Sequence, residues 1–323
     1  MNITILDGYT LNPGDNPWTP VEKLGTVTVF DRTLPEDTLE RAQGAQVLLT
    51  NKTPLPADVI NALPELEYIS VLATGYDVVD IRAAEKRGIP VSNVPGYSTP
   101  AVAQHVFALL LELSSKTAGY DRAVKAGEWG AQPDFCHIKF PQAELQGKRL
   151  GIVGFGSIGQ AVARIGHAFG MEILAHAPRP KPQPSWGKVT FTDLDELFEQ
   201  ADAVSLHCPQ TEENKGFIDR SLIARMRPSA MLINTARGTL INEPDLADAL
   251  NNDVIAGAGL DVVAAEPISE NNPLMTAKNC LITPHVAWAT LESRKRLMEQ
   301  TARNIDAFMN RAPVNVVNGV TFA

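Results

Sequence analysis

Three side chains in the second half of the sequence could together exchange a hydride with a small 2-oxo acid. Arg237, Glu266 and His285 each follow a short apolar run that is typical of a β-strand. The arginine fork matches a carboxylate, and histidine can pass a proton to a carbonyl oxygen near neutral pH. Glu266, if hydrogen-bonded to the other ring nitrogen, would orient the imidazole and favour its protonated form. The set predicts a hydride-transfer site.

Each of these residues also has an ordinary interpretation when it is taken alone. Arg237 could be a surface ion-pair residue, Glu266 a solvated loop acid and His285 a structural histidine. In open α/β sheets, however, ligands bind beyond the carboxyl ends of the strands, which is where all three are expected. Their order therefore favours catalysis, whereas His105 and His137 are expected to be ordinary structural residues.

A glycine-rich turn upstream predicts a dinucleotide-binding site. The apolar run 150–153 reads as a strand, and Gly154–Gly159 has the pattern Gly-x-Gly-x-x-Gly before a helical pattern. Gly154 would turn the chain, Gly156 would admit a pyrophosphate, and Gly159 would let the helix pack closely on the strand. The phosphates would lie at the helix N-terminus, where unpaired N–H groups favour an anion. A tight strand–helix turn with no ligand is the alternative.

Short β-rich runs alternate with helical patterns along the whole chain, which predicts parallel sheets covered by helices. We expect an α/β fold with two doubly wound parallel-sheet domains, Rossmann-like or flavodoxin-like. A six-stranded Rossmann pattern occupies residues 98–289 and would bind NAD(P). It would be inserted into a discontinuous substrate-binding domain of residues 1–97 and 290–323. A helical pattern of about twenty residues from position 98 or 99, roughly 30 Å long, and another at 291–309 would connect the two domains.

Composition excludes several classes of function. The chain has 323 residues, and 44% of them are hydrophobic, which suits two soluble domains. The formal net charge of −9 argues against nucleic acid or an anionic membrane as a partner. The apolar run 106–111 is too short to span a bilayer, so a cytoplasmic protein is expected. Cys136, Cys208 and Cys280 are too widely spaced to suggest a disulfide framework or a metal site.

The ordered motifs resemble the D-isomer-specific 2-hydroxyacid dehydrogenases over essentially the whole chain. In the second half they are Gly154–Gly159, Asn234–Gly238, Gly259–Val262 with Glu266, and Pro284–Ala287. In the first domain, segments 74–80 and 88–95 match family patterns. The resemblance implies that Arg237, Glu266 and His285 form the catalytic set and that the N–H groups of Thr74 and Gly75 bind the substrate carboxylate. It also implies cofactor contacts at Ser157, Ile158, Cys208, Thr235, Ala236 and Asp261. Finally, it implies a homodimer built through the cofactor domain.

Several of these residues keep an alternative role. Asp261 could cap a helix or a turn instead of contacting the cofactor. Cys208 is expected to be a small loop residue lining the cofactor rather than a nucleophile, because no basic group is placed to activate it. Trp288 could form a wall of the substrate pocket or pack between the domains.

The expected cofactor preference rests on one departure from the usual NAD-binding pattern. NAD-using relatives carry an acidic residue about twenty positions after the glycines to bind the ribose hydroxyls. Ala177 stands there, and Arg179 and Lys181 follow. These cations could pair with a 2′-phosphate, so NADP(H) is expected to be accepted and slightly favoured. The alternative is that they are solvated and that NAD(H) is held by the backbone.

Within the family, Trp288 and the loop 134–136 resemble the glycerate dehydrogenase or hydroxypyruvate reductase branch. This implies reduction of hydroxypyruvate to D-glycerate and of glyoxylate to glycolate. Glu266 argues against formate dehydrogenase, whose pattern lacks a glutamate paired with the histidine. A dehydrogenase for another 2-oxo acid or for phosphite remains an alternative, as does a nucleotide-sensing scaffold similar to the C-terminal binding protein corepressors.

Overall fold

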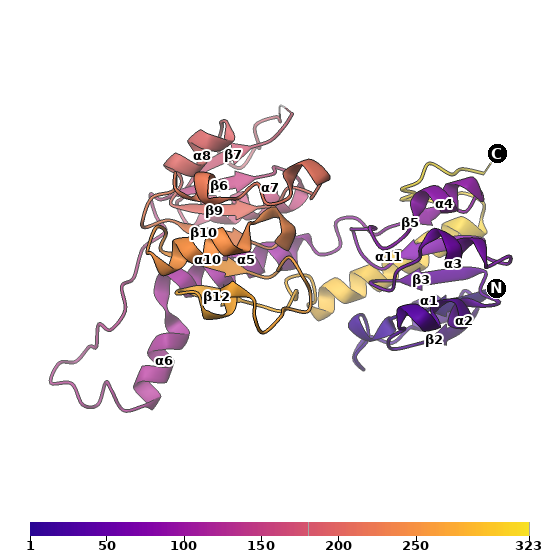
Figure 1. Cartoon of the computed structure of the whole chain (residues 1–323), viewed down its shortest axis with the longest axis horizontal. Helices are drawn as coiled ribbons and strands as arrows, with labels where there is room; N and C mark the ends of the chain where they lie inside the picture. Colours follow the sequence, from indigo (N-terminus) through magenta and orange to yellow (C-terminus); the bar gives the residue numbers. More distant parts are fainter. Residues whose placement is uncertain (180, 323) are drawn as a thin grey trace. The chain divides into compact units, whose positions relative to one another are not determined.

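The computed structural model describes residues 1–179 and 181–322, which form two compact α/β units (Figure 1). The first unit combines Met1–Ser98 with Trp288–Ala323, and the second is the continuous segment Thr99–Ala287. One unit is thus inserted into the other along the sequence. The first boundary was expected after residue 97 and is observed after residue 98. The second was expected after residue 289 and is observed after residue 287.

The first unit is built on a five-stranded parallel sheet in the order β2-β1-β3-β4-β5, which is the flavodoxin-like order. Along β3, Val47 and Leu49 belong to one apolar cluster and Leu48 belongs to the cluster on the opposite face. Burial on both faces explains why the central strands are continuous apolar runs. The strands are β1 (Asn2–Ile5), β2 (Thr26–Val29), β3 (Val47–Thr50), β4 (Tyr68–Val71) and β5 (Val91–Ser92).

Helices cover both faces of this sheet. Buried side chains of α2, α3 and α4 belong to one cluster, and those of α1 and α11 belong to the other. The helix α11 occupies the predicted range, and its Phe308 stacks on Tyr68 with ring centroids 4.5 Å apart. The helices are α1 (Thr19–Glu22), α2 (Thr38–Ala42), α3 (Ala57–Asn61), α4 (Ile81–Lys86) and α11 (Leu291–Met309), with 3-10 turns η1 (Gly8–Thr10) and η2 (Pro35–Asp37).

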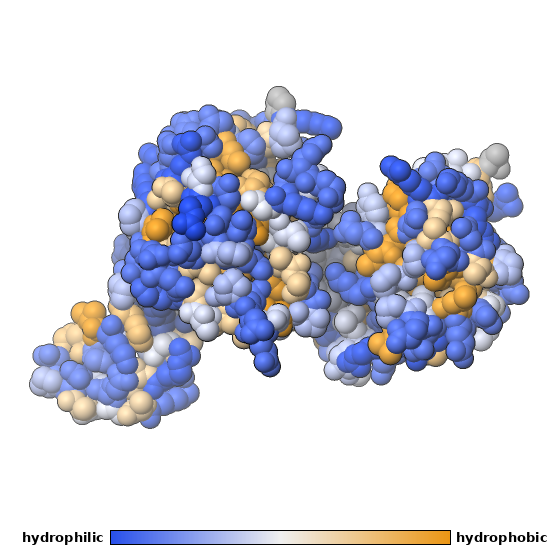
Figure 2. All heavy atoms as spheres, viewed as in Figure 1, coloured by the Kyte–Doolittle hydropathy of each residue, from blue (hydrophilic) through white to orange (hydrophobic). Residues whose placement is uncertain are grey.

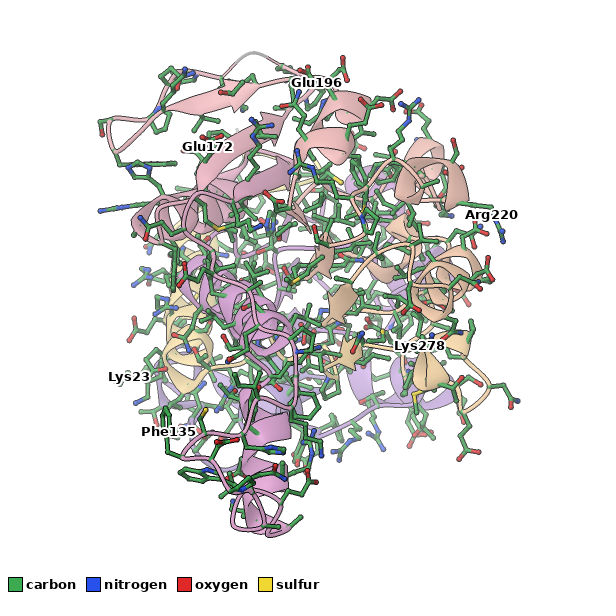
Figure 3. The ribbon with its side chains drawn as sticks, turned by 90° about the vertical axis from the view of Figure 1, so that its left-hand side faces the viewer. Lys23, Phe135, Glu172, Glu196, Arg220 and Lys278 are labelled. Atoms are coloured by element: carbon green, nitrogen blue, oxygen red, sulfur yellow. The ribbon has the colours of Figure 1, made fainter. Side chains whose placement is uncertain are left out.

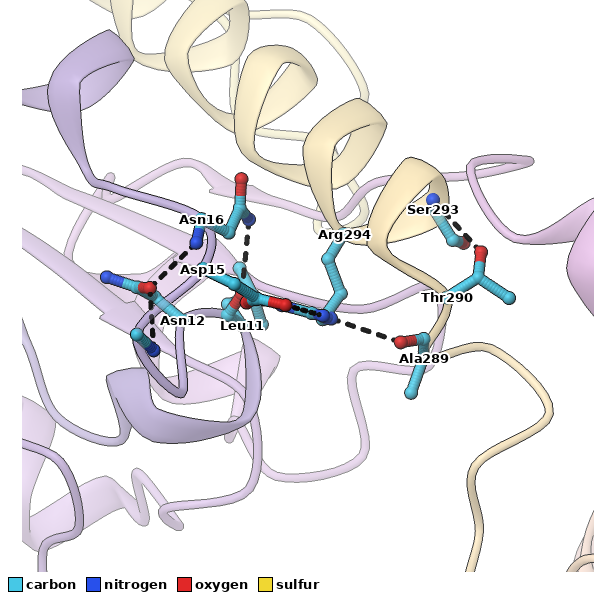
Figure 4. A network of polar contacts seen from close by, with 9 residues as sticks. Leu11, Asn12, Asp15, Asn16, Ala289, Thr290, Ser293 and Arg294 are labelled. Atoms are coloured by element: carbon cyan, nitrogen blue, oxygen red, sulfur yellow. Dashed lines mark hydrogen bonds and ion pairs between the residues drawn. The ribbon is translucent and has the colours of Figure 1, made fainter.

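Hydrogen bonds of Arg294 link the start of α11 to the loop after η1 (Figure 4). Its guanidinium donates to both carboxylate oxygens of Asp15, at 2.5 and 2.8 Å, and to the carbonyl oxygens of Leu11 and Ala289, at 3.1 and 3.0 Å. The arginine is 7% exposed whereas the Asp15 side chain is 49% exposed, so the fork geometry is what strengthens the bonds to the carboxylate. The Arg294 hydrogen bond holds the pKa of the Asp15 carboxyl below its usual value.

The second unit contains a seven-stranded parallel sheet in the order β12-β11-β10-β9-β6-β7-β8. Counted from β6, six of its strands follow the Rossmann order. The six strands of the expected Rossmann pattern are present, and the further strand expected at 280–283 is β12, which pairs with β11 and extends the same sheet. The strands are β6 (Arg149–Val153), β7 (Glu172–His176), β8 (Val189–Phe191), β9 (Ala203–Leu206), β10 (Met231–Asn234), β11 (Gly257–Leu260) and β12 (Cys280–Ile282).

Helices lie on both faces of the second sheet as well. Buried residues of α5 and α7 join one apolar cluster, and those of α8, α9 and α10 join the other. The helices are α5 (Thr99–Ser115), α6 (Thr117–Lys125), α7 (Ser157–Ala168), α8 (Leu194–Gln200), α9 (Arg220–Ile223) and α10 (Glu243–Asn251), with 3-10 turns η3 (Glu212–Asn214), η4 (Gly238–Leu240) and η5 (Pro273–Thr276).

The long helix expected from position 98 or 99 is in fact two helices. Lys116 adopts a left-handed conformation with φ of 55°, which ends α5 and starts α6 in a new direction. The whole of α5 belongs to the second unit. We call α6 together with the following loop, residues 117–145, the arm; it extends away from the seven-stranded sheet (Figure 1).

Candidate active site

His285 and Glu266 form a direct pair beyond the carboxyl ends of β11 and β12. His285 Nδ1 lies 2.6 Å from Glu266 Oε2, and the two side chains are 26% and 35% exposed. Because a carboxylate only accepts hydrogen bonds, Nδ1 carries a hydrogen and Nε2 is the ring nitrogen left for another partner. Glu266 is itself held, since its Oε1 accepts a hydrogen bond from the N–H of Val263 at 3.2 Å.

Asp261 positions the loop that carries His285. Its backbone oxygen accepts from the His285 N–H at 2.8 Å, and its two carboxylate oxygens accept from the N–H groups of Val286 and Ala287 at 2.9 Å each. Asp261 is 1% exposed and follows β11 directly. The turn-capping alternative thus describes what the carboxylate does here, while its contact with a cofactor stays a prediction.

Arg237 lies on the loop after β10, the strand next to β11. The buried side chain of Asn234 shapes this loop: its Nδ2 donates to the Arg237 oxygen at 2.8 Å, and its Oδ1 accepts from the Ala236 N–H at 3.0 Å. Arg237 Nη1 donates to the Ala236 oxygen at 2.8 Å, which directs the guanidinium from its own loop. The arginine therefore follows a strand that neighbours the strand before Glu266, at the same edge of the sheet.

Gly238 brings the Arg237 loop against the segment that leads to Glu266. A Cβ at this position would stand 1.9 Å from the carbonyl carbon of Val263 and 2.4 Å from the nitrogen of Ala264. Backbone atoms cannot move aside as the end of a side chain can, so only glycine fits. The close approach couples the two loops that carry Arg237 and Glu266.

The glycine turn has the geometry of an anion site at a helix N-terminus. A Cβ at Gly154 would stand 2.6 Å from the backbone nitrogen of Cys208, and one at Gly159 would stand 2.2 Å from the Gly154 oxygen. At Gly156, by contrast, no heavy atom of the described residues other than its chain neighbours lies within 4 Å of the equivalent point. Gly156 caps α7 without a side chain, so the N–H groups of Ser157 and Ile158 face open space or a ligand.

Two neighbouring groups fit the edge of a nucleotide site. The hydroxyl of Thr235, just after β10, is buried and has no hydrogen-bond partner among the described residues. Such an atom is costly unless something else satisfies it, which is consistent with the expected cofactor contact. Cys208 is half-buried, and burial raises the pKa of its thiol, which keeps it protonated and unreactive as expected.

The residues expected to set cofactor preference follow β7. Ala177 comes directly after the strand and is half-buried, and Arg179 is exposed. Across residues 1–179 and 181–322, no ion pair engages Arg179 or Lys181. Both cations are therefore free to meet an incoming phosphate or to remain in water.

The remaining predicted residues lie in the first unit. Thr74 and Gly75 belong to the loop after β4, where the Thr74 hydroxyl donates to the Val94 oxygen at 3.0 Å. Trp288 packs its indole edge-on against Tyr97, with ring centroids 6.3 Å apart, and joins an apolar cluster of its own unit. Substrate contacts by these three residues stay predictions.

The second unit thus joins a glycine turn for a dinucleotide to a histidine–glutamate pair and an arginine at one edge of a Rossmann sheet. The sequence model of the D-isomer specific 2-hydroxyacid dehydrogenase NAD binding domain matches residues 107–287. The chain belongs to this dehydrogenase family. It is an oxidoreductase with an NAD-binding domain, and the family suggested by the sequence motifs is confirmed.

Relatives of this dehydrogenase cover its whole length. A protein of Blautia hydrogenotrophica named hydroxypyruvate reductase is 46% identical over 98% of this chain and 100% of its own. A glycerate dehydrogenase of Methylorubrum extorquens is 40% identical over 88% of both chains. The structure resembles an NADPH-dependent glyoxylate/hydroxypyruvate reductase of Sinorhizobium meliloti, solved with NADP and malonate, with a TM-score of 0.85, 26% identity and coverage of 100% of this chain and 98% of that one.

Within the described residues, no group of three or more His, Cys, Asp or Glu side chains is arranged to hold a metal ion. Among the helices of those same residues, none is both long and apolar enough to cross a membrane.

Sequence reasoning missed three supporting groups of the dehydrogenase site. The Asn234 amide, the Thr283 hydroxyl and the His105 ring all touch the loops that carry the expected catalytic residues. Asn234 belongs to the motif Asn234–Gly238 and is the last residue of β10, and this position at the end of a strand was a usable signal. His105 lies 178 residues from its partner Thr283, and no local pattern connects the two.

Proposed function

We propose that this dehydrogenase reduces hydroxypyruvate to D-glycerate, and glyoxylate to glycolate, with His285 and Glu266 as the acid–base pair. The contact between His285 Nδ1 and Glu266 Oε2 carries the proposal, because it leaves Nε2 as a proton donor at the carboxyl edge of the sheet. The hydroxypyruvate reductase and the glycerate dehydrogenase named above support the substrate assignment.

Each residue of the set has a distinct role in this reaction. The Arg237 fork binds the substrate carboxylate and, through its remaining donors, polarises the adjacent carbonyl. His285 Nε2–H protonates the carbonyl oxygen, and it takes the hydroxyl proton in the reverse direction. Glu266 stabilises the imidazolium and fixes the ring orientation through Nδ1. When bound, the reduced nicotinamide supplies the hydride.

The chain's own residues fit a nicotinamide dinucleotide. The open space at Gly156 and the bare N-terminus of α7 would receive the pyrophosphate, and the unpartnered Thr235 hydroxyl would gain a partner. We propose that NADP(H) is accepted and slightly favoured over NAD(H). Ala177 removes the carboxylate that would repel a 2′-phosphate, and Arg179 offers an exposed guanidinium beside it.

Initial rates of nicotinamide oxidation test both proposals. Purified protein is assayed with NADH and, separately, with NADPH, against hydroxypyruvate, glyoxylate and pyruvate. Turnover concentrated on hydroxypyruvate, with NADPH at least matching NADH, is the expected result. Activity with NADH alone would overturn the cofactor preference and leave the catalytic assignment intact. Turnover of pyruvate alone, or of phosphite with NADP⁺, would overturn the substrate assignment.

A nucleotide-sensing scaffold is the candidate from another class of protein. It would bind NAD(P)H without turning over any of the three oxo acids. Fluorescence titration with NADPH, run beside the rate assay, separates a scaffold from protein that has lost its cofactor site, because the scaffold binds and the damaged protein does not.

We also propose that the dehydrogenase is a homodimer built through its second unit. Apolar side chains of the arm are exposed to solvent, with Phe135 at 91% and Ile138 at 84% (Figures 2 and 3). An apolar groove between α5 and α7, lined by Phe107 and Ile165 among others, offers further uncovered surface on the same unit. Exposed apolar surface of this kind is typical of protein–protein contacts.

A further inference from the structure

A chain of hydrogen bonds runs from α5 to the loop that carries His285. His105 Nε2 on α5 lies 2.9 Å from Thr283 Oγ1, which lies 2.6 Å from Asp261 Oδ1. The carboxylate of Asp261 then accepts the N–H groups of residues 286 and 287. All of these residues belong to the second unit, and Thr283 comes directly after β12.

The chemistry of the three groups fixes the direction of this chain. A carboxylate only accepts, so Thr283 must give its single hydroxyl hydrogen to Asp261. The hydroxyl oxygen then has only lone pairs to offer His105, so His105 Nε2 must carry a hydrogen and donate it. His105 Nε2 is also 3.5 Å from Asp261 Oδ1, which further favours a hydrogen on this nitrogen.

At the far end of this series of hydrogen bonds, the loop that carries His285 has a backbone conformation that is unfavourable by itself. His285 has a φ of 55°, in the left-handed region that residues other than glycine seldom adopt. Asp261 accepts three consecutive N–H groups, from residues 285, 286 and 287, with its backbone oxygen and both carboxylate oxygens. The His285 N–H also lies 3.0 Å from the Thr283 oxygen, so backbone oxygens hold His285 itself, while the Asp261 carboxylate fixes the two residues that follow it and thereby stabilises the turn.

We propose that His105 is a positioning residue for His285 and acts through Thr283 and Asp261. Its Nε2–H orients the Thr283 hydroxyl, the hydroxyl fixes the Asp261 carboxylate, and the carboxylate holds the turn that aims the catalytic imidazole. The inference rests on the proposed role of His285 as proton donor. The His105 side chain is 21% exposed, and both atoms within reach of its Nε2, Thr283 Oγ1 and Asp261 Oδ1, are polar, so this nitrogen serves polar partners.

Two pairs of variants test this series of hydrogen bonds. Thr283→Val removes the hydroxyl and keeps the shape, whereas Thr283→Ser keeps the hydroxyl. His105→Leu removes the donor, whereas His105→Gln keeps an N–H near the position of Nε2. We expect kcat for hydroxypyruvate to fall at least tenfold in the valine and leucine variants and to stay within threefold in the serine and glutamine variants. KM for hydroxypyruvate should change less than threefold in all four, because Arg237 is untouched.

Hydrogen–deuterium exchange of the peptide that contains residues 284–288 gives a readout that does not depend on turnover. Exchange of the amides of Val286 and Ala287 should rise in the valine and leucine variants and not in the serine and glutamine variants. Thr190→Val, at an exposed position of β8, is the matched control and should change neither readout.

The outcomes separate this inference from the proposed function. Wild-type exchange and kcat in both Thr283→Val and His105→Leu would overturn the inference. Equal losses of kcat and of NADPH binding, without rescue by serine or glutamine, would also overturn it, because they indicate general damage. If the wild type does not reduce hydroxypyruvate, the proposed function fails, and the exchange experiment still decides whether His105 holds the loop.

Discussion

At the scale of single residues, the pair of His285 and Glu266 gives the clearest prediction. Glu266→Gln keeps the shape of the side chain and removes the charge that stabilises the imidazolium. We expect kcat to fall about 100-fold, or about 3 kcal/mol of transition-state stabilisation, with a smaller change in KM. Steady-state kinetics with hydroxypyruvate checks this, and the exposed Glu270→Gln is the control that should keep wild-type activity. A kcat within threefold of wild type would remove Glu266 from the mechanism.

Ala177 carries the prediction on cofactor preference. Ala177→Asp places a carboxylate directly after β7, where it can accept hydrogen bonds from the ribose hydroxyls and repel a 2′-phosphate. We expect the ratio of kcat/KM for NADPH to kcat/KM for NADH to fall at least tenfold. Arg179→Met should lower the same ratio by weakening NADPH alone. An unchanged ratio in both variants would mean that neither position meets the ribose.

His207 predicts how stability depends on pH. Burial lowers the pKa of this imidazole from its ordinary 6.5 to about 3. The unfolded chain therefore binds a proton at His207 before the folded chain does. This contribution to stability is complete above pH 6.5 and is lost as the pH falls from 6.5 towards 3, at about 1.4 kcal/mol per pH unit.

Urea unfolding of wild type and of His207→Asn, at pH 7.5 and at pH 5.5 and at one protein concentration, measures this contribution. The asparagine variant should lose less stability on acidification than wild type does. The exposed His167→Asn is the control, and its pH dependence should follow wild type. Identical slopes for wild type and His207→Asn would contradict the prediction.

Residue types and order were enough to predict that Glu266 and His285 meet, and not enough to predict how they are held. Glu266 and His285, 19 positions apart, meet as expected because each follows a neighbouring parallel strand. The contacts of His105 could not be predicted, because they depend on where α5 crosses the sheet. Asp261 has two chemically reasonable roles, and sequence alone offers no way to choose between them.

At the scale of elements, the network at the start of α11 carries a prediction on stability. Arg294→Met keeps the aliphatic stem and leaves the carbonyl oxygens of Leu11 and Ala289 without this donor. We expect the free energy of unfolding to fall by about 2 kcal/mol, because the Ala289 oxygen and the Asp15 carboxylate lose this donor, while Asn16 Nδ2 still donates to the Leu11 oxygen. Urea unfolding is the measurement. Arg303→Met, an exposed position of the same helix, should unfold at the wild-type midpoint.

The elements that could be predicted are those with strong periodic or capping signals. The helix α11 ends where expected, and Thr290 caps its start by accepting from the Ser293 N–H at 3.2 Å. The break at Lys116 could not be predicted, because the nearest glycine, Gly119, lies inside the helix that follows and a lysine seldom adopts a positive φ. The run 280–282 was recognised as a strand, but its place in the sheet depends on pairing with β11, which local pattern does not report.

At the scale of the whole molecule, the arm carries a prediction on the proposed homodimer. A double change, Phe135→Asp with Ile138→Asp, places two charges on its exposed apolar surface. We expect wild type to sediment as a dimer and the double variant to dissociate at protein concentrations at least tenfold higher, because burying charge opposes association. Sedimentation velocity over a dilution series measures this. A wild type that sediments as a monomer at every concentration would refute the homodimer.

The contact at Gly238 has a consequence for changing what the enzyme accepts. Since the carbonyl carbon of Val263 leaves no room for a side chain there, the two loops behave as one rigid piece, and a library of substitutions at position 238 should return glycine alone among active clones. Altered substrate scope must then come from positions whose side chains face open space. An engineer should leave this junction untouched and vary the surfaces around it.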